Sequence, residues 1–298
     1  MLIWLALLAL SDAAGPIARP DLSAAVARYG KTGSQEELEI LIASGVPGAQ
    51  AFLDGLTAIK ARDFPAACRA WGTAADVSAE AAHFTAECYQ NGYEGAPKDM
   101  ARAVALYTAA GEGGYAKSLC ALGNLYAFGE GVPADPARGF ALCRRGAEAG
   151  DPDAQTDLGN FYGRGEGVQR DYGQARFWYE QAASQNQRNA AFQRATMAWN
   201  GLGGPVDRVE AGIWFEKAYS VGRKDAALLI GRSALTRAVP NAPVGPVDLV
   251  LLAEARRWIL IATTEDPEPE GRAAAAVLAA QISGYEALAR QDSRVPST

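Results

Sequence analysis

Histidine is almost absent from this chain, which has 298 residues and a single imidazole, His83. A metal site built from several histidines is therefore excluded, and a serine-type triad would have to use this one residue. Clusters of Lys and Arg are also lacking, and the formal net charge is −6. Because nucleic-acid-binding proteins neutralise phosphates with clustered cations, we expect no DNA or RNA partner.

Long apolar runs are lacking too, except at the start of the chain. Leu2–Leu10 is uninterrupted, but its nine residues are too few to span a membrane, which takes about 20. The run and the small residues after it are typical of a secretory signal peptide, although no Lys or Arg precedes them. We expect residues 1–14 to be removed on export, giving a periplasmic or secreted protein without a transmembrane span. If the segment is kept as a buried helix, the protein is cytoplasmic.

Glycine, by contrast, is abundant, and its spacing is regular. Similar runs begin at Gly129, Gly165 and Gly201, which gives a period of 36 residues twice over. The same step separates three aspartates that follow the glycines, Asp135, Asp171 and Asp207. One period earlier the pattern recurs with one additional residue ahead of Gly95. The chain therefore contains internal repeats.

Each repeat has the pattern of two helices. Apolar residues recur at helical spacing over residues 154–162, and a Gly-x-Gly turn follows, since glycine adopts left-handed dihedrals without strain. The aspartate after the turn is expected to cap the second helix, whose apolar stripe includes Trp178 and Tyr179. Trp71 and Trp214 are likewise expected in the core. One helix pair cannot bury its stripe alone, so neighbouring pairs must stack.

The unit from Ala154 to Ala183 resembles the Sel-one-like repeat, a relative of the tetratricopeptide repeat. This resemblance implies an all-α fold, a right-handed α-solenoid of stacked antiparallel helix pairs with repeats of about 36 residues. It also implies that the concave face holds a protein or peptide partner. We expect a helical lead-in over residues 15–47 and repeats over 48–264. Residues 265–298 are expected to form an acidic loop, a rather polar capping helix and a disordered tail.

Four cysteines follow the apolar segment: Cys68, Cys88, Cys120 and Cys143. None lies in a C-x-x-C motif, and one histidine leaves no reasonable zinc site. The first two lie symmetrically about a short turn, and the other two lie at similar heights in a helical hairpin. We therefore hypothesise the disulfides Cys68–Cys88 and Cys120–Cys143, which suit an oxidising compartment. Four buried free thiols are the alternative.

Other possible chemistry is weak. The glycines of Gly163–Gly167 recur one repeat earlier as a turn and lack the features of a phosphate-binding loop. His83 and Cys88 are five residues apart without an orienting acid, and Glu130 and Glu166 are equivalent positions of successive repeats rather than an acid–base pair. We expect no catalytic, cofactor or metal site. Trp199, near the end of a first helix, is a candidate for partner contact.

These observations favour a non-catalytic scaffold of the cell envelope that binds a protein or peptide partner and needs no cofactor. The alternative is a cell-wall-associated enzyme, or a factor that binds peptidoglycan fragments, built on the same repeats. The lack of an evident nucleophile–base pair in the sequence argues against an enzyme.

Overall fold

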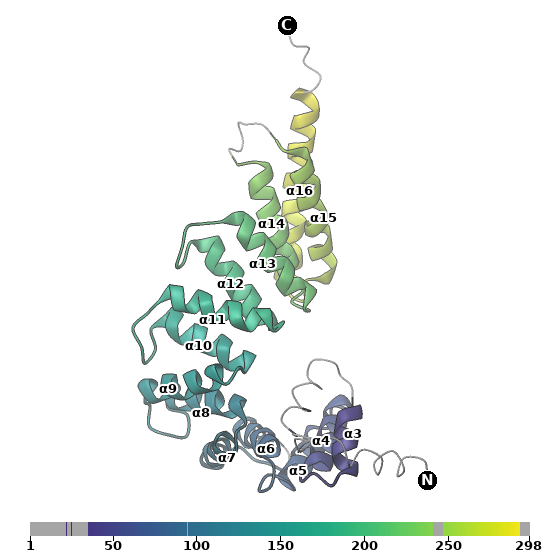
Figure 1. Ribbon diagram of the computed structural model, residues 1–298. Helices are drawn as coiled ribbons and strands as arrows, with labels where there is room; N and C mark the ends of the chain where they lie inside the picture. Colours follow the sequence, from purple (N-terminus) through teal and green to yellow (C-terminus); the bar gives the residue numbers. More distant parts are fainter. Residues whose placement is uncertain (1–21, 23–24, 26–34, 94, 241–246, 293–298) are drawn as a thin grey trace, which may run out of the picture. The chain divides into compact units, whose positions relative to one another are not determined.

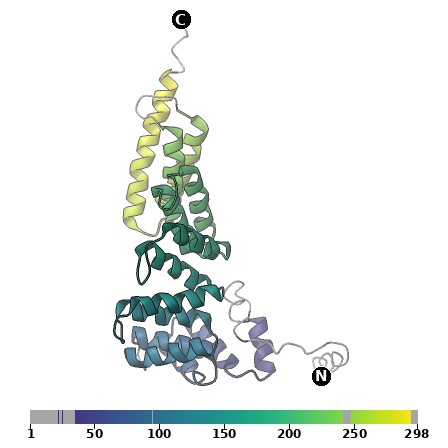
Figure 2. The same ribbon diagram turned by 60° about the vertical axis from the view of Figure 1, so that its left-hand side comes forward.

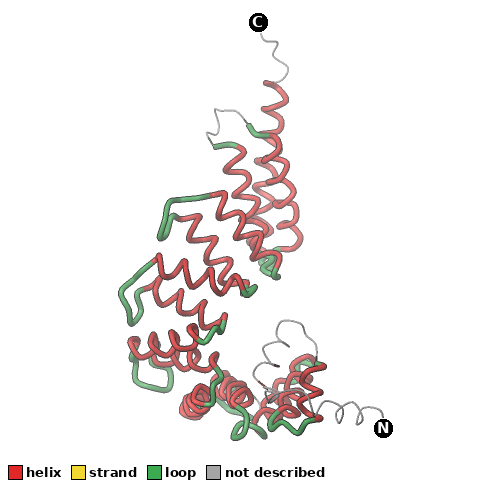
Figure 3. The backbone as a smooth tube through the Cα atoms, in the orientation of Figure 1, coloured by secondary structure: helices red, strands yellow, loops and turns green. Residues whose placement is uncertain are grey.

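The computed structural model describes residues 22, 25, 35–93, 95–240 and 247–292 (Figure 1). The expected signal peptide, much of the lead-in and the C-terminal tail lie outside these residues. In the described part of the chain the regular secondary structure is helical, apart from one isolated bridge between Tyr93 and Ala96 (Figure 3). The all-α class predicted from the sequence is confirmed.

The chain forms two compact units, residues 1–118 and 119–298. The helices of unit 1 are α3 (Glu36–Ala43), α4 (Ala49–Lys60), α5 (Phe64–Gly72), α6 (Ala79–Asn91) and α7 (Met100–Glu112). Helix α8 (Ala116–Phe128) begins at the boundary. It is followed in unit 2 by α9 (Pro136–Glu148), α10 (Pro152–Arg164), α11 (Tyr172–Ser184), α12 (Arg188–Asn200), α13 (Arg208–Ser220), α14 (Ala226–Ala238), α15 (Leu249–Glu265) and α16 (Pro269–Asp292).

Within each unit, consecutive helices pack against one another as antiparallel pairs (Figure 2). From α6 to α14 each helix has 13 residues, so the 36-residue sequence period is one helix pair with its two connections. The expected acidic loop is shorter than predicted, because α15 ends at Glu265 and α16 already begins at Pro269. Asp266 is buried in this connection and accepts a hydrogen bond from the backbone N–H of Glu268.

The predicted helix caps are present. The side chains of four aspartates each accept a hydrogen bond from the backbone N–H three residues later, at the start of the second helix of a pair: Asp99, Asp135, Asp171 and Asp207. Such a bond satisfies an amide that has no partner within the helix. The recurring aspartate therefore fixes where each second helix begins.

The second glycine of the Gly-x-Gly turn sets the distance between repeats. Gly167 has φ +65° and lies against the backbone of Pro136, the first residue of the preceding second helix. Gly203, with φ +72°, lies in the same way against Tyr172, 36 residues after Pro136. A Cβ atom at either glycine would overlap that backbone. The turn is thus both a chain reversal and a contact surface.

Small residues fill much of the core, and three repeats place a buried aromatic ring at the same position of the second helix. Tyr107, Tyr179 and Phe215 are buried at this ring position, and Cys143 takes the same place in the 36-residue register. Trp71 is buried as predicted. The prediction that Trp178 and Trp214 are core residues is wrong in part, since both are half-buried. Each precedes the buried ring by one residue, and one residue rotates a side chain by about 100° around the helix.

The final helix, α16, has one buried side and one exposed side. Its buried side includes Ala275 and Ile282. Its exposed side mixes small and apolar residues with polar ones: Val277 and Leu288 are at least half exposed, and Gln281 and Arg290 are exposed as well. The charged Glu286 of this helix is bonded to Arg256 of α15 at 2.5 Å. The exposed side of α16 is therefore partly polar and partly apolar.

Candidate binding site on the first helices of unit 2

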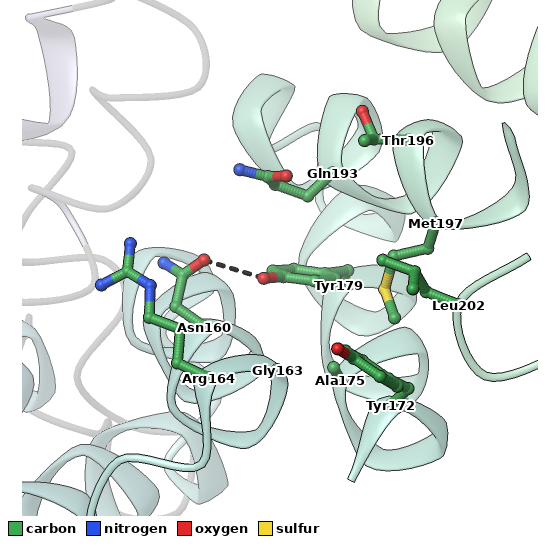
Figure 4. A pocket seen from close by; sticks show the side chains of 10 residues that line it. All are labelled: Asn160, Gly163, Arg164, Tyr172, Ala175, Tyr179, Gln193, Thr196, Met197 and Leu202. Atoms are coloured by element: carbon green, nitrogen blue, oxygen red, sulfur yellow. Dashed lines mark hydrogen bonds between the residues drawn. The ribbon is translucent and has the colours of Figure 1, made fainter. Parts of the chain in front are cut away.

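A connected set of polar side chains crosses the first helices of unit 2. The Tyr179 hydroxyl on α11 donates to Oδ1 of Asn160 on α10 at 2.8 Å (Figure 4). Asn160 Nδ2 donates to Asp157 Oδ1 at 3.3 Å, and Asn124 Nδ2 on α8 donates to Asp157 Oδ2 at 2.9 Å. The network therefore fixes side chains of three helices relative to one another.

Beside this network lies a pocket of 260 Å³ between α10, α11 and α12 (Figure 4). Its inner wall is formed by the buried Ala175, Tyr179 and Met197. Arg164 and Gln193 are exposed at its rim. The pocket therefore combines an apolar interior with polar groups at its edge, an arrangement typical of binding sites. The remaining lining residues are Asn160, Gly163, Tyr172, Thr196 and Leu202.

Gly163 leaves part of this pocket open. The sequence groups it with the turn glycines, but it lies inside α10, and only Gly165 and Gly167 have positive φ. The interpretation of Gly163 as a turn residue is therefore wrong. A Cβ atom here would meet only Ala175 Cβ within 4 Å, at 3.8 Å, which is an ordinary contact.

Trp199 lies 36 residues after Gly163, at the end of α12. Its side chain is half-buried, and the guanidinium of Arg208 stands over its ring at 3.8 Å. Arg208 also donates to the Trp199 carbonyl oxygen. The indole thus packs within its own helix pair, and only part of it could touch a partner.

Burial dominates the electrostatics of the network. Burial raises the pKa of Asp157, while hydrogen bonds from Asn124 and Asn160 oppose the shift. Burial also raises the pKa of Tyr179 to about 12; the charge of Arg164 lowers it and that of Asp157 raises it. Both groups thus favour their neutral forms more strongly than in water.

The Tyr179 shift predicts an alkaline loss of stability. Because its folded pKa of about 12 exceeds the ordinary value of 10.0, the stability contributed by the neutral phenol is full below pH 10 and is lost as the pH rises towards 12. The loss should be on the order of 2 kcal/mol. Urea unfolding of wild type and Tyr179→Phe below pH 10 and near pH 12 measures it. The variant should show a smaller alkaline loss, and equal losses in the two proteins would contradict the assignment.

The helix pairs from α6 to α13 match a known repeat family. The profile of the Sel1 repeat matches residues 79–115, 116–151, 152–187 and 188–222. These four units are Sel1 repeats. The boundaries agree with the periodicity, since each matched unit begins at the first residue of α6, α8, α10 or α12. The candidate network and pocket lie within the second, third and fourth Sel1 repeats.

Solved structures of Sel1 repeat proteins are similar to this chain. One is a protective antigen of uropathogenic Escherichia coli with an SLR fold, with 26% sequence identity and a TM-score of 0.57. The match covers 85% of this chain but only 56% of that protein's length. A Sel1 repeat protein from Oxalobacter formigenes shares the fold with a TM-score of 0.57 and 24% identity, over 83% of this chain and 99% of its own. No curated sequence matches the chain significantly.

Two disulfides each join two consecutive helices. Cys68 on α5 pairs with Cys88 on α6, with 5.9 Å between their Cα atoms, and Cys120 on α8 pairs with Cys143 on α9. These are the two pairs hypothesised from the sequence, and all four residues are buried. Cys88 has no free thiol in this structure, which agrees with the sequence-based argument against a His83–Cys88 nucleophile pair.

Sequence reasoning missed the partner of His83. Ser118 Oγ lies 2.9 Å from His83 Nδ1, although 35 residues separate them, and Glu87 Oε1 lies 3.3 Å from His83 Nε2. The order Ser–His–Glu resembles a catalytic relay, but His83 and Ser118 are both completely buried. The imidazole instead packs among aromatic rings, including those of Tyr107 and Tyr115. Its role is therefore to fill and hold the core of unit 1.

The described residues contain no group of three or more His, Cys, Asp or Glu side chains placed to hold a metal ion. None of the described helices combines the length and apolar character needed to cross a bilayer.

Proposed function

We propose that this protein is a non-catalytic scaffold of the cell envelope that binds an extended polypeptide along the first helices of unit 2. The observation that carries this proposal is the polar network beside the apolar pocket on α10 and α12. Sel1 repeats commonly mediate protein interactions, and four of them occur here.

The exposed chemistry of this face suits a polypeptide backbone. Gln193 is exposed and Thr196 is half-buried at the pocket rim. The Gln193 amide can both donate and accept hydrogen bonds. The Thr196 hydroxyl donates to the Phe192 carbonyl oxygen at 3.0 Å and can still accept one, so the two side chains can pair with the C=O and N–H groups of an extended chain. The adjacent pocket can then take a side chain of that chain, which gives selectivity.

The envelope location rests on the cysteines and the first residues of the chain. Disulfides persist in oxidising compartments and are rare in the cytosol. The expected signal peptide over residues 1–14 supports the same location. We expect N-terminal sequencing of the native protein to begin after this segment, and recovery of an intact Met1 from the cytosolic fraction would overturn the envelope assignment.

A library of immobilised extended peptides tests the binding function. We expect the wild type to retain a subset of peptides and Gln193→Lys/Thr196→Lys to lose about tenfold in affinity, because two lysines obstruct the face. The matched control is Gln174→Lys/Gln181→Lys on α11, at two exposed positions outside the pocket. Equal retention by both double variants, or none by the wild type, would refute polypeptide binding here. A melting temperature raised only by peptidoglycan fragments would favour the alternative function.

A further inference from the structure

We infer that the pocket beside Gly163 accepts the ring of an aromatic residue carried by the bound polypeptide. This inference rests on the proposed function, to which it adds the chemistry of the partner. The pocket lies in the third and fourth Sel1 repeats and is lined by α10, α11 and α12, with Leu202 from the following turn.

The next repeat shows what fits at this position. Residues 127, 163 and 199 occupy the same place in successive repeats, as Ala127, Gly163 and Trp199. The indole of Trp199 lies on Arg208, 3.8 Å from its guanidinium carbon, and its centroid is 6.5 Å from that of Phe215. Those two residues stand 36 positions after Tyr172 and Tyr179, which line the pocket. An internal indole therefore occupies in one repeat the place that Gly163 leaves open in the other.

The size and lining of the pocket agree with this occupant. Its volume is 260 Å³, and a cavity of about 150 Å³ can hold benzene. The rings of Tyr172 and Tyr179 offer faces and edges to another aromatic ring, and the Met197 thioether makes favourable contacts with rings. Arg164, exposed at the rim, can stand over a bound ring as Arg208 stands over Trp199. A straight-chain polar side chain would use none of these contacts.

Gly163 gives a direct way to block the pocket. Its backbone is helical, and an added Cβ atom would make only an ordinary contact, at 3.8 Å from Ala175 Cβ. Gly163→Trp places in this repeat the same residue that the next repeat carries at position 199. Gly284→Trp is the matched control, because Gly284 also lies within a helix and a Cβ atom there would meet nothing within 4 Å.

Titration with N-acetyl-L-tryptophanamide, followed by backbone amide NMR of the full chain, tests the inference. We expect saturable shifts centred on Gly163, Thr196 and Met197, with a Kd on the order of 1 mM for so small a probe. The affinity should fall about tenfold or more in Gly163→Trp and stay unchanged in Gly284→Trp. N-acetyl-L-leucinamide should bind more weakly than the tryptophan probe. Shifts elsewhere, no saturation, or equal binding by both variants would overturn the inference, and the wild-type shift map decides the matter even if Gly163→Trp fails to fold.

The peptide library separates this inference from the proposed function. Retained peptides should carry an aromatic residue, and changing that residue to leucine or using Gly163→Trp should weaken them about tenfold. If peptides without an aromatic residue bind, and bind equally well to Gly163→Trp, the inference of an aromatic-binding pocket is wrong. The proposed scaffold function would not be affected by that result. If no peptide is retained, the polypeptide-binding function fails whatever the probe does.

Discussion

Gly167→Ala should destabilise unit 2 by about 3 kcal/mol, more than an ordinary glycine-to-alanine change in a turn. Two effects add. The left-handed conformation, with φ +65°, costs an alanine about 1 kcal/mol. The new Cβ atom would also overlap the backbone of Pro136 and Ala137, and inserting atoms into a filled space costs about 1–3 kcal/mol. Because backbone atoms cannot rotate away, the preceding repeat has to move.

Gly150→Ala separates the two effects. Gly150 also has positive φ, at +93°, but a Cβ atom there would meet nothing within 4 Å. This control should therefore lose only about 1 kcal/mol. Urea unfolding of both variants, with comparable m-values, measures the difference. If both lose the same free energy, the contact between Gly167 and the preceding repeat has no energetic consequence.

Removal of the second disulfide, in Cys120→Ala/Cys143→Ala, should lower the free energy of unfolding by about 3 kcal/mol. The bond closes a loop with a sequence separation of 23 residues, and loops of this size restrict the unfolded chain by about that amount. A cavity adds to the loss, because Cys143 occupies the place of the buried rings of Tyr107, Tyr179 and Phe215.

Reductant supplies the control for this variant. It should destabilise the wild type through both disulfides, and the Cys120→Ala/Cys143→Ala protein only through Cys68–Cys88, which has a sequence separation of 20 residues. Mass spectrometry after alkylation without reductant should find no modified cysteine. Four modified cysteines in the native protein would contradict the disulfide assignment. So would a wild type whose free energy of unfolding is unchanged by reductant.

The periodic features could be predicted from the sequence because repetition reveals them. Asp171 as a helix cap, Gly165 as a turn and the 36-residue helix pair each recur, so local chemistry and spacing suffice. The pocket could not be predicted in this way. Gly163 reads as a turn glycine beside Gly165, and only the packing of α11 and α12 shows that it borders an open volume.

Contacts between side chains that are far apart in the sequence could not be predicted from the repeat pattern either. Ser118 lies 35 residues from His83, and Asn124 lies 33 residues from Asp157. Such pairs depend on which face each helix turns to its neighbour. The burial of Trp178 was overestimated for a related reason, because a helical stripe does not say which of two adjacent aromatic residues points inwards.

The contacts of Gly167 and Gly203 with the helix before each of them join neighbouring repeats, and in a solenoid each repeat contacts only its neighbours. Losing one such contact therefore weakens a single junction, meaning the interface between two neighbouring repeats. The helix pairs on either side of it can then unfold at different denaturant concentrations. A chain built in this way can break at a junction near Gly167 while its disulfide-bonded pairs stay folded. Where such a junction opens first, a single melting temperature describes the weakest junction, and the losses expected for Gly167→Ala and Gly150→Ala refer to the unfolding of the helix pairs that contain these residues.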